Sequence, residues 1–407
     1  PGKKPEHEGC PGHGCGHNLL GTGALAGALA LKDYLEETGK PGTVVYFGTP
    51  AEENLSGKAF MARDGAFDGV DFFLTWHPAP ENRTATPHLN ANVCRTYKFK
   101  GITSHAGGAP ELGRSALDSC EIMGVGANYL REHVIMEARI HYAYLDVGGR
   151  APNVVQDHAA VRYVVRAPYY RQVKEIVPRL DDVARGAALI CGTQVTVERE
   201  SGYSEYINNK VLAQAATEAF HAIGAPQWDD RDFALAKAFT DSFSDSMKTK
   251  EKDMILKRYG RNRLEEKLAR PLDTEIKDFD PDREELDFGS TDVGDVGFIA
   301  PTYYFNVATE ALGTPGHSWY KTGQVNSSIG QKGMLTAGDI AGYDMHTITD
   351  PSLRKVPIFN ILSALEGQLL TETGEVVNTI TGEVILALPE GTDLPPYRKK
   401  ETVLICG

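Results

Sequence analysis

The sequence has little cysteine, no long apolar run and no excess of positive charge. Its six cysteines among 407 residues are too few and too scattered for a disulfide scaffold, so we expect a cytoplasmic protein. No stretch approaches the roughly 18 consecutive apolar residues of a membrane-spanning helix, which argues against a membrane partner. The 42 basic and 55 acidic residues give a net charge of −13. That sign disfavours nucleic acid and anionic lipid as partners.

Several common catalytic motifs are also absent. The chain contains no G-x-S-x-G elbow, no Walker loop, no G-x-G-x-x-G after a strand and no H-E-x-x-H helix. Its 41% hydrophobic and 24% charged residues are typical of a globular protein. At about 150 residues per domain, the length predicts two or three domains.

Helices and short apolar strands alternate at the start of the chain. The expected segments are a helix over 18–37, a strand over 43–49, a helix over 57–64 and a strand over 71–77. This alternation predicts an α/β fold with a parallel sheet covered on both faces. Functional groups gather at the carboxyl ends of such strands, where Glu52, Glu53 and His77 fall.

The pattern changes after Cys94. Strands are expected over 94–100, 139–145, 158–166 and 194–199, with helices over 115–132 and 170–191. This β-α-β-β-α-β order is the ferredoxin-like signature. We therefore expect an inserted domain at 95–205 and a main domain formed by 1–94 and 206–407.

The second half of the main domain is expected to begin with a helix over 209–223. The charge-rich stretch 229–287 is interpreted as solvated helices and loops, as such runs usually are. After it we expect loops over 289–295 and 314–317, and a helix over 327–346.

The densest group of metal-ligand side chains is the HGCGH segment, residues 13–17. In extended backbone, residues two apart point the same way, so Cys15 and His17 can face one centre. Thiolate and imidazole suit Zn(II) and related divalent ions. A glycine-rich turn with ordinary histidines is the alternative, and Cys10 is interpreted as a bystander.

Two adjacent carboxylates, Glu52 and Glu53, follow the first predicted strand. A metal hydrolase needs one carboxylate as a ligand and another, free one to take a proton from water. Neighbouring residues point to different sides, so Glu53 can be the ligand and Glu52 the base. Ordinary loop charges are the alternative.

Three histidines complete the candidates. His77 ends a predicted strand, and His317 lies on a loop shaped by glycine and proline. His105 belongs to the inserted domain, so it reaches such a site only if that domain folds over it. Structural or surface histidines are the alternative for all three.

These motifs together resemble a family of dinuclear metallohydrolases that includes aminoacylases, carboxypeptidases and indole-acetyl-amino-acid hydrolases, and within it the aminobenzoyl-glutamate branch. The segments that carry the resemblance are GHGCGHNLLGTG (12–23), GTPAEE (48–53), GKAFMARDGAFDGVD (57–71), TWHP (75–78), SHAGGAPELGRSALD (104–118), APNVVQD (151–157), GSTDVGDV (289–296), and GTPGHSW with SSIGQKGM (313–334). The chain departs from the branch at Gln156, where a proline is common, and at Gln331, where a histidine is common.

The resemblance implies a zinc-peptidase-like α/β catalytic domain with an inserted ferredoxin-like lid that pairs two subunits, as a homodimer or a heterodimer with a related subunit. It implies two divalent ions per subunit, Zn(II) or Mn(II). The positions that match the family's metal ligands are Cys15, His17, Glu53, His77 and His317. Glu52 matches the general base and His105 the lid histidine that reaches a neighbouring subunit, while Asn153 and Arg166 match substrate-binding positions.

The activity implied by the resemblance is hydrolysis of an N-acyl amino acid amide such as p-aminobenzoyl-glutamate. A dipeptidase or carboxypeptidase with the same chemistry is one alternative. Only fourteen residues precede Cys15, whereas relatives carry a helix and sheet strands there, so we expect the N-terminal part of the catalytic domain to be missing. A catalytically inert partner subunit is therefore the other alternative.

Overall fold

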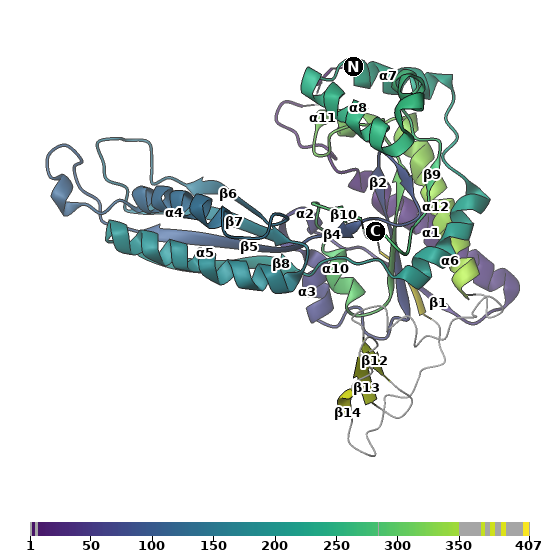
Figure 1. Ribbon diagram of the computed structural model, residues 1–407, viewed down its shortest axis with the longest axis horizontal. Helices are drawn as coiled ribbons and strands as arrows, with labels where there is room; N and C mark the ends of the chain where they lie inside the picture. Colours follow the sequence, from purple (N-terminus) through teal and green to yellow (C-terminus); the bar gives the residue numbers. More distant parts are fainter. Residues whose placement is uncertain are drawn as a thin grey trace.

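The computed structural model describes residues 2–4, 7–283, 285–349, 368–370, 375–378, 384–387 and 402–406. Figure 1 shows a broad α/β body from which a narrow arm of two helices on a sheet projects to one side. Within the described residues, no helix combines the length and apolar character needed to cross a bilayer.

A six-stranded sheet runs through the body in the order β1-β15-β2-β11-β3-β9. Its strands are β1 (Thr43–Phe47), β15 (Thr402–Cys406), β2 (Phe72–Ala79), β11 (Thr302–Ala308), β3 (Asn82–Arg83) and β9 (Ile276–Lys277). The first four are parallel, and β3 runs antiparallel to β11. The predicted α/β class with a parallel sheet is therefore confirmed, with an antiparallel addition at one edge.

Three helices cover one face of this sheet: α1 (His17–Thr38), α6 (Lys210–Ile223) and α12 (Ser328–Thr349). Leu31, Trp76 and Phe305 are fully buried between them and the strands. Helices α1 and α12 can approach closely because Gly27 has no side chain. A Cβ at this position would lie only 2.6 Å from the Cβ of Ala341. This apolar layer buries one face of β2 and leaves the alternate residues to face the other side.

The second face carries two shorter helices, α3 (Gly57–Arg63) and α10 (Val293–Gly297). Phe73 packs here, and Thr75 and His77 follow it at two-residue intervals along β2. The loop predicted over 289–295 is partly wrong, because α10 begins at Val293. Because α10 packs against α3, it brings the GSTDVGDV segment beside residues that follow β1.

The arm has the β-α-β-β-α-β element order and an antiparallel sheet in the order β6-β7-β5-β8. Its elements are β5 (Ala91–Lys100), α4 (Ala116–Arg131), β6 (Arg139–Asp146), β7 (His158–Ala167), α5 (Tyr170–Cys191) and β8 (Gln194–Tyr203). Both helices pack on one face of the sheet around a core that includes Met123 and Val161. The sheet begins at Ala91, four residues before the expected insertion.

The charge-rich segment forms α7 (Asp230–Asp241), α8 (Asp245–Tyr259) and α9 (Leu264–Ala269). The prediction that it is solvated is wrong at several positions, because Asp232, Glu251, Lys267 and Asp273 are buried. Asp273 lies 3.2 Å from Arg258 and accepts a hydrogen bond from a backbone amide. These two partners compensate the buried charge of Asp273. The amide belongs to Asn82, which is far from Asp273 in sequence, so the sequence pattern could not predict the contact.

The remaining elements are short. They are α2 (Glu52–Leu55), β4 (His88–Leu89), η1 (Pro110–Leu112), η2 (Arg261–Arg263), β10 (Leu286–Asp287), α11 (Trp319–Val325), β12 (Gln368–Leu370), β13 (Glu375–Asn378) and β14 (Val384–Ala387).

Candidate metal centre

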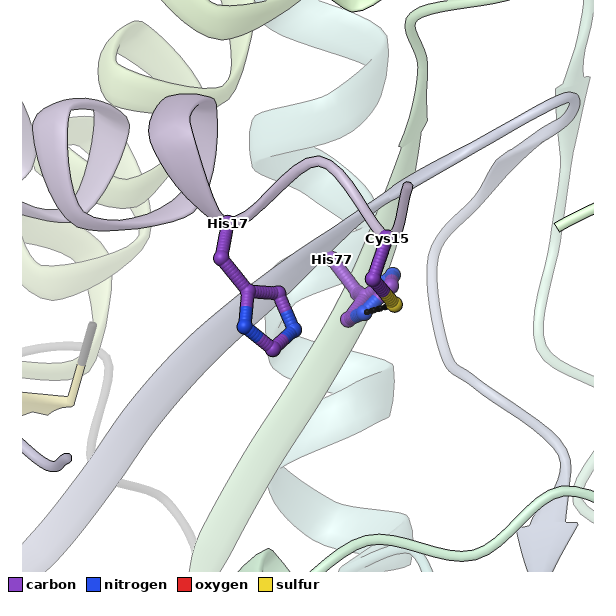
Figure 2. Close-up of side chains that lie close together, drawn as sticks. All are labelled: Cys15, His17 and His77. Atoms are coloured by element: carbon purple, nitrogen blue, oxygen red, sulfur yellow. Dashed lines mark hydrogen bonds between the residues drawn. The ribbon is translucent and has the colours of Figure 1, made fainter. Parts of the chain in front are cut away.

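The turn before α1 brings Cys15 and His17 toward the end of β2. Gly16 has a left-handed backbone (φ 88°), and a Cβ there would lie 2.9 Å from the Cβ of Pro78, so both conformation and space favour glycine. The expected extended backbone at residues 15–17 is therefore wrong, but Cys15 and His17 still face one centre. Figure 2 shows Cys15 beside His77, with His17 next to them at the start of the helix.

Cys15, His17 and His77 form one potential metal site. Their ligand atoms all lie within 4.8 Å of one another, and Cys15 Sγ is 3.4 Å from His77 Nε2. His77 Nδ1 lies 2.8 Å from the carbonyl oxygen of Pro78, which can only accept a hydrogen bond, so Nδ1 carries the proton and Nε2 keeps its lone pair. Desolvation lowers the pKa of His77 to about 3, which keeps the ring neutral.

Glu53 and His317 extend this group. Glu53 Oε1 lies 3.5 Å from His317 Nε2 and 3.8 Å from His17 Nε2, and Cys15, Glu53 and His317 form a second potential metal site. His317 has a positive φ of 52°, and its backbone amide donates to the oxygen of Gly14 at 2.8 Å. The structure therefore brings all five candidate ligands together from four separate segments.

The donor set fits divalent metal ions. One thiol, three imidazoles and a carboxylate are ligand types that Zn(II) and similar ions accept. The five donors exceed what one tetrahedral ion needs, and a third overlapping group places the Glu52 carboxylate within 4.8 Å of ligand atoms of His17 and Glu53.

Glu52 lies in the same place but in a different environment from Glu53. Its Oε2 is 3.9 Å from His17 Nε2, and its side chain is 20% exposed, against 40% for Glu53. Burial, followed by the charge of nearby Asp292, raises the pKa of Glu52 to about 7. Both carboxylates lie within 4 Å of His17 Nε2, so the two side chains do not point to opposite sides as expected. They differ mainly in how deeply they are buried.

A buried ion pair beside Glu52 was not predicted. Lys58 Nζ lies 3.0 Å from Asp292 Oδ1, and the backbone amide of Lys58 donates to Asp292 Oδ2 at 2.9 Å. Both residues stand in segments of the family resemblance, which assigned them no role. Glu52, Lys58, His77, Thr291 and Tyr304 are among the residues that line a cavity of about 220 Å³.

His105 and Asn153 do not lie with these residues. The backbone amide of Ala106 donates to the oxygen of Asn153, so both candidates sit at the far end of the arm, beyond Lys100. Ten residues of β5, at about 3.3 Å each, separate that end from the body by roughly 33 Å. Neither side chain is therefore placed to reach the centre of its own chain.

Arg166 lies at the opposite end of the arm. It pairs across the sheet with Asn92, whose side chain donates to Ser290 Oγ at 3.4 Å. Tyr203, also opposite Asn92, donates to the same hydroxyl at 3.2 Å. The buried Nε of Arg166 has no hydrogen-bond partner among the described residues. Arg166 is thus the one candidate of the arm placed near the body.

Metal binding should release a proton from Cys15. Burial raises the pKa of this thiol to about 12, so it is protonated at pH 8 in the metal-free protein, while a bound thiol is a thiolate. Affinity for Zn(II) should therefore increase with pH, and calorimetry in buffers of different ionisation enthalpy measures the released proton. Cys15→Asp, which is already ionised, should release about one proton fewer. Equal proton release from both proteins would contradict the assignment.

Comparison with known proteins identifies the family. Residues 3–246 match the family described as Peptidase family M20/M25/M40. The chain is 41% identical over 329 residues to a p-aminobenzoyl-glutamate hydrolase subunit from Escherichia coli K12, and the match covers 80% of this chain and 68% of that protein. It is 34% identical over 224 residues to a mouse Xaa-Arg dipeptidase, covering 54% of this chain and 52% of that protein.

A solved structure from methicillin-resistant Staphylococcus aureus, regarded as an aminohydrolase, has the same fold. Its TM-score is 0.52 at 17% identity, over 82% of this chain and 73% of that one. The chain belongs to peptidase family M20/M25/M40, a family of metal-dependent hydrolases that act on amide bonds.

Proposed function

We propose that this protein hydrolyses the amide bond of an N-acyl amino acid, with p-aminobenzoyl-glutamate as the representative substrate. The observation that carries the proposal is the convergence of five candidate metal-ligand side chains beside a cavity that His17, His77 and the partly buried carboxylate of Glu52 line. The similarity to the E. coli p-aminobenzoyl-glutamate hydrolase subunit supports the choice of substrate.

In the proposed mechanism Glu52 moves the proton. Two divalent ions, Zn(II) or Mn(II), would be held by Cys15, His17, Glu53, His77 and His317 and would supply Lewis-acid polarisation when bound. Glu52 takes a proton from the attacking water and returns it to the nitrogen of the leaving amine. A pKa of about 7 suits both transfers, because a base and its conjugate acid are then both accessible near neutral pH.

We propose that residues 95–205 form a ferredoxin-like lid that pairs with a second subunit. Strand β6 is an edge of the arm's sheet, and most of its residues are exposed. Ile122, Val125 and Tyr129 form an exposed apolar stripe on α4, with Val125 53% and Tyr129 72% exposed. An unpaired edge beside an apolar stripe is a surface that another subunit can cover.

The partner is proposed to be a second copy or a related subunit. The E. coli relative is named as one subunit of its hydrolase, which supports a heteromeric alternative. In either assembly, the arm's end would carry His105 and Asn153 into a neighbouring cavity, where His105 would donate to the developing oxyanion.

The proposed function can be tested by removing the free carboxylate of the substrate. We expect metal-loaded protein to cleave p-aminobenzoyl-glutamate and to cleave its α-carboxamide poorly, because Arg166 at the arm's base pairs with the free carboxylate. Arg166→Gln should raise KM about 10- to 100-fold with a smaller change in kcat, the loss expected for a charged hydrogen bond. Equal cleavage of both substrates would contradict this role.

The same assay separates the alternatives. A mouse relative is an Xaa-Arg dipeptidase, so a preference for Xaa-Arg dipeptides would favour a dipeptidase. If metal-loaded protein cleaves neither p-aminobenzoyl-glutamate nor Xaa-Arg dipeptides, the result would favour a catalytically inert subunit.

A further inference from the structure

Lys321 is a buried cation close to the candidate metal centre. It lies on α11, which begins two residues after His317, and its Nζ is 2.8 Å from Glu310 Oε1. The side chains of Lys321 and Glu310 are only 6% and 1% exposed. Because the two charges compensate each other, this cation can lie near a metal site without adding a net positive charge.

The ammonium of Lys321 has a second contact, which reaches the site. Its Nζ donates to the carbonyl oxygen of Pro78 at 3.0 Å. The same oxygen accepts the hydrogen bond from His77 Nδ1 at 2.8 Å. A carbonyl oxygen has two lone pairs and can accept both bonds. Lys321 therefore holds the group that orients the His77 ring.

This contact also joins segments that are far apart in sequence. Pro78 follows His77 on β2, and its ring lies against Gly16, between Cys15 and His17. Burial is the main cause of the raised pKa of Cys15 and of the lowered pKa of His77, and among charged neighbours Lys321 has the largest influence on each, favouring the thiolate and the neutral imidazole. One ammonium is thus close to two of the candidate ligands.

We propose that Lys321, with Glu310, is a positioning residue for the metal centre. It fixes the Pro78 carbonyl, which fixes the protonated Nδ1 of His77 and directs Nε2 toward Cys15 Sγ. The inference rests on the proposed metal-dependent function and adds a residue that acts through a ligand without being one. Partners that orient ligand histidines commonly change metal affinity 10- to 100-fold when they are lost.

The test is a double variant, Lys321→Met with Glu310→Gln. Removing only Lys321 would leave a buried uncompensated carboxylate and endanger folding, whereas the double variant keeps volume and removes both charges. We expect Zn(II) affinity, measured by competition with a chromophoric chelator, to fall about 10- to 100-fold. In Co(II)-loaded protein, the visible spectrum should change because His77 is less firmly oriented.

The control is a buried pair that touches no candidate ligand. Arg258 and Asp273, 3.2 Å apart and 10% and 0% exposed, provide it as Arg258→Gln with Asp273→Asn. We expect this control to lose thermal stability but keep the wild-type Zn(II) affinity.

Three outcomes decide between the possibilities. Wild-type affinity and Co(II) spectrum in the Lys321→Met, Glu310→Gln protein would overturn the positioning role while leaving the proposed function intact. An equal loss of affinity in both double variants would also overturn it, because the effect would then follow stability. A wild-type protein that binds no divalent metal would overturn both proposals.

Discussion

Replacing Glu52 by glutamine should lower kcat by roughly 10² to 10⁴ while the protein keeps its metal. The substitution preserves the shape of the side chain and removes only the proton acceptor, and the stated loss is the usual contribution of general base catalysis. Glu52 fits this role because it is the more buried of the two adjacent carboxylates and has a raised pKa. Metal content by elemental analysis and kcat on the same sample provide the measurement.

Glu53→Gln is the matched control for that experiment. Glu53 Oε1 lies within 4 Å of two candidate ligand histidines, so its loss should lower metal occupancy and activity together. High metal concentration should recover part of the activity of this variant and none of the activity of Glu52→Gln. If metal is lost from Glu52→Gln and kept by Glu53→Gln, the two roles are reversed.

The second large effect is expected from His105→Ala. We expect metal content to stay unchanged and kcat to fall about 10²- to 10³-fold, the cost of deleting one donor to an oxyanion. His105 lies at the end of the arm, beyond the ten residues of β5, and its Nδ1 accepts a bond from the amide of Gly108 at 2.9 Å. That bond leaves Nε2 as the donor toward a substrate of the neighbouring subunit.

Mixing variants tests whether the site is shared. In a dimer of one His105→Ala and one Glu52→Gln subunit, one site has an intact Glu52 and receives His105 from its partner, so activity should partly return. As a control, a doubly substituted Glu52→Gln, His105→Ala partner should restore nothing. No recovery despite demonstrated subunit exchange would contradict the shared site and leave His105 without a role in the neighbouring cavity.

The sequence alone determined the class of fold and the chemical types at the site. Alternating helical and apolar segments predicted α1, β1, α3 and β2 to within a few residues, because periodicity is a local property of the chain. The candidate ligands stood out because thiol, imidazole and carboxylate groups beside glycine turns or strand ends are recognisable without any long-range information.

Only the tertiary structure decided how these groups differ from one another. Glu52 and Glu53 are neighbours in sequence, yet they differ in burial, which is the difference on which the proposed roles of base and ligand rest. The pair of Lys58 and Asp292 joins residues 234 positions apart, and Lys321 reaches Pro78 across 243 positions. The projection of the arm likewise placed His105 away from its own site. Burial and ion pairing depend on which segments pack together, and hydrophobic periodicity does not specify that choice.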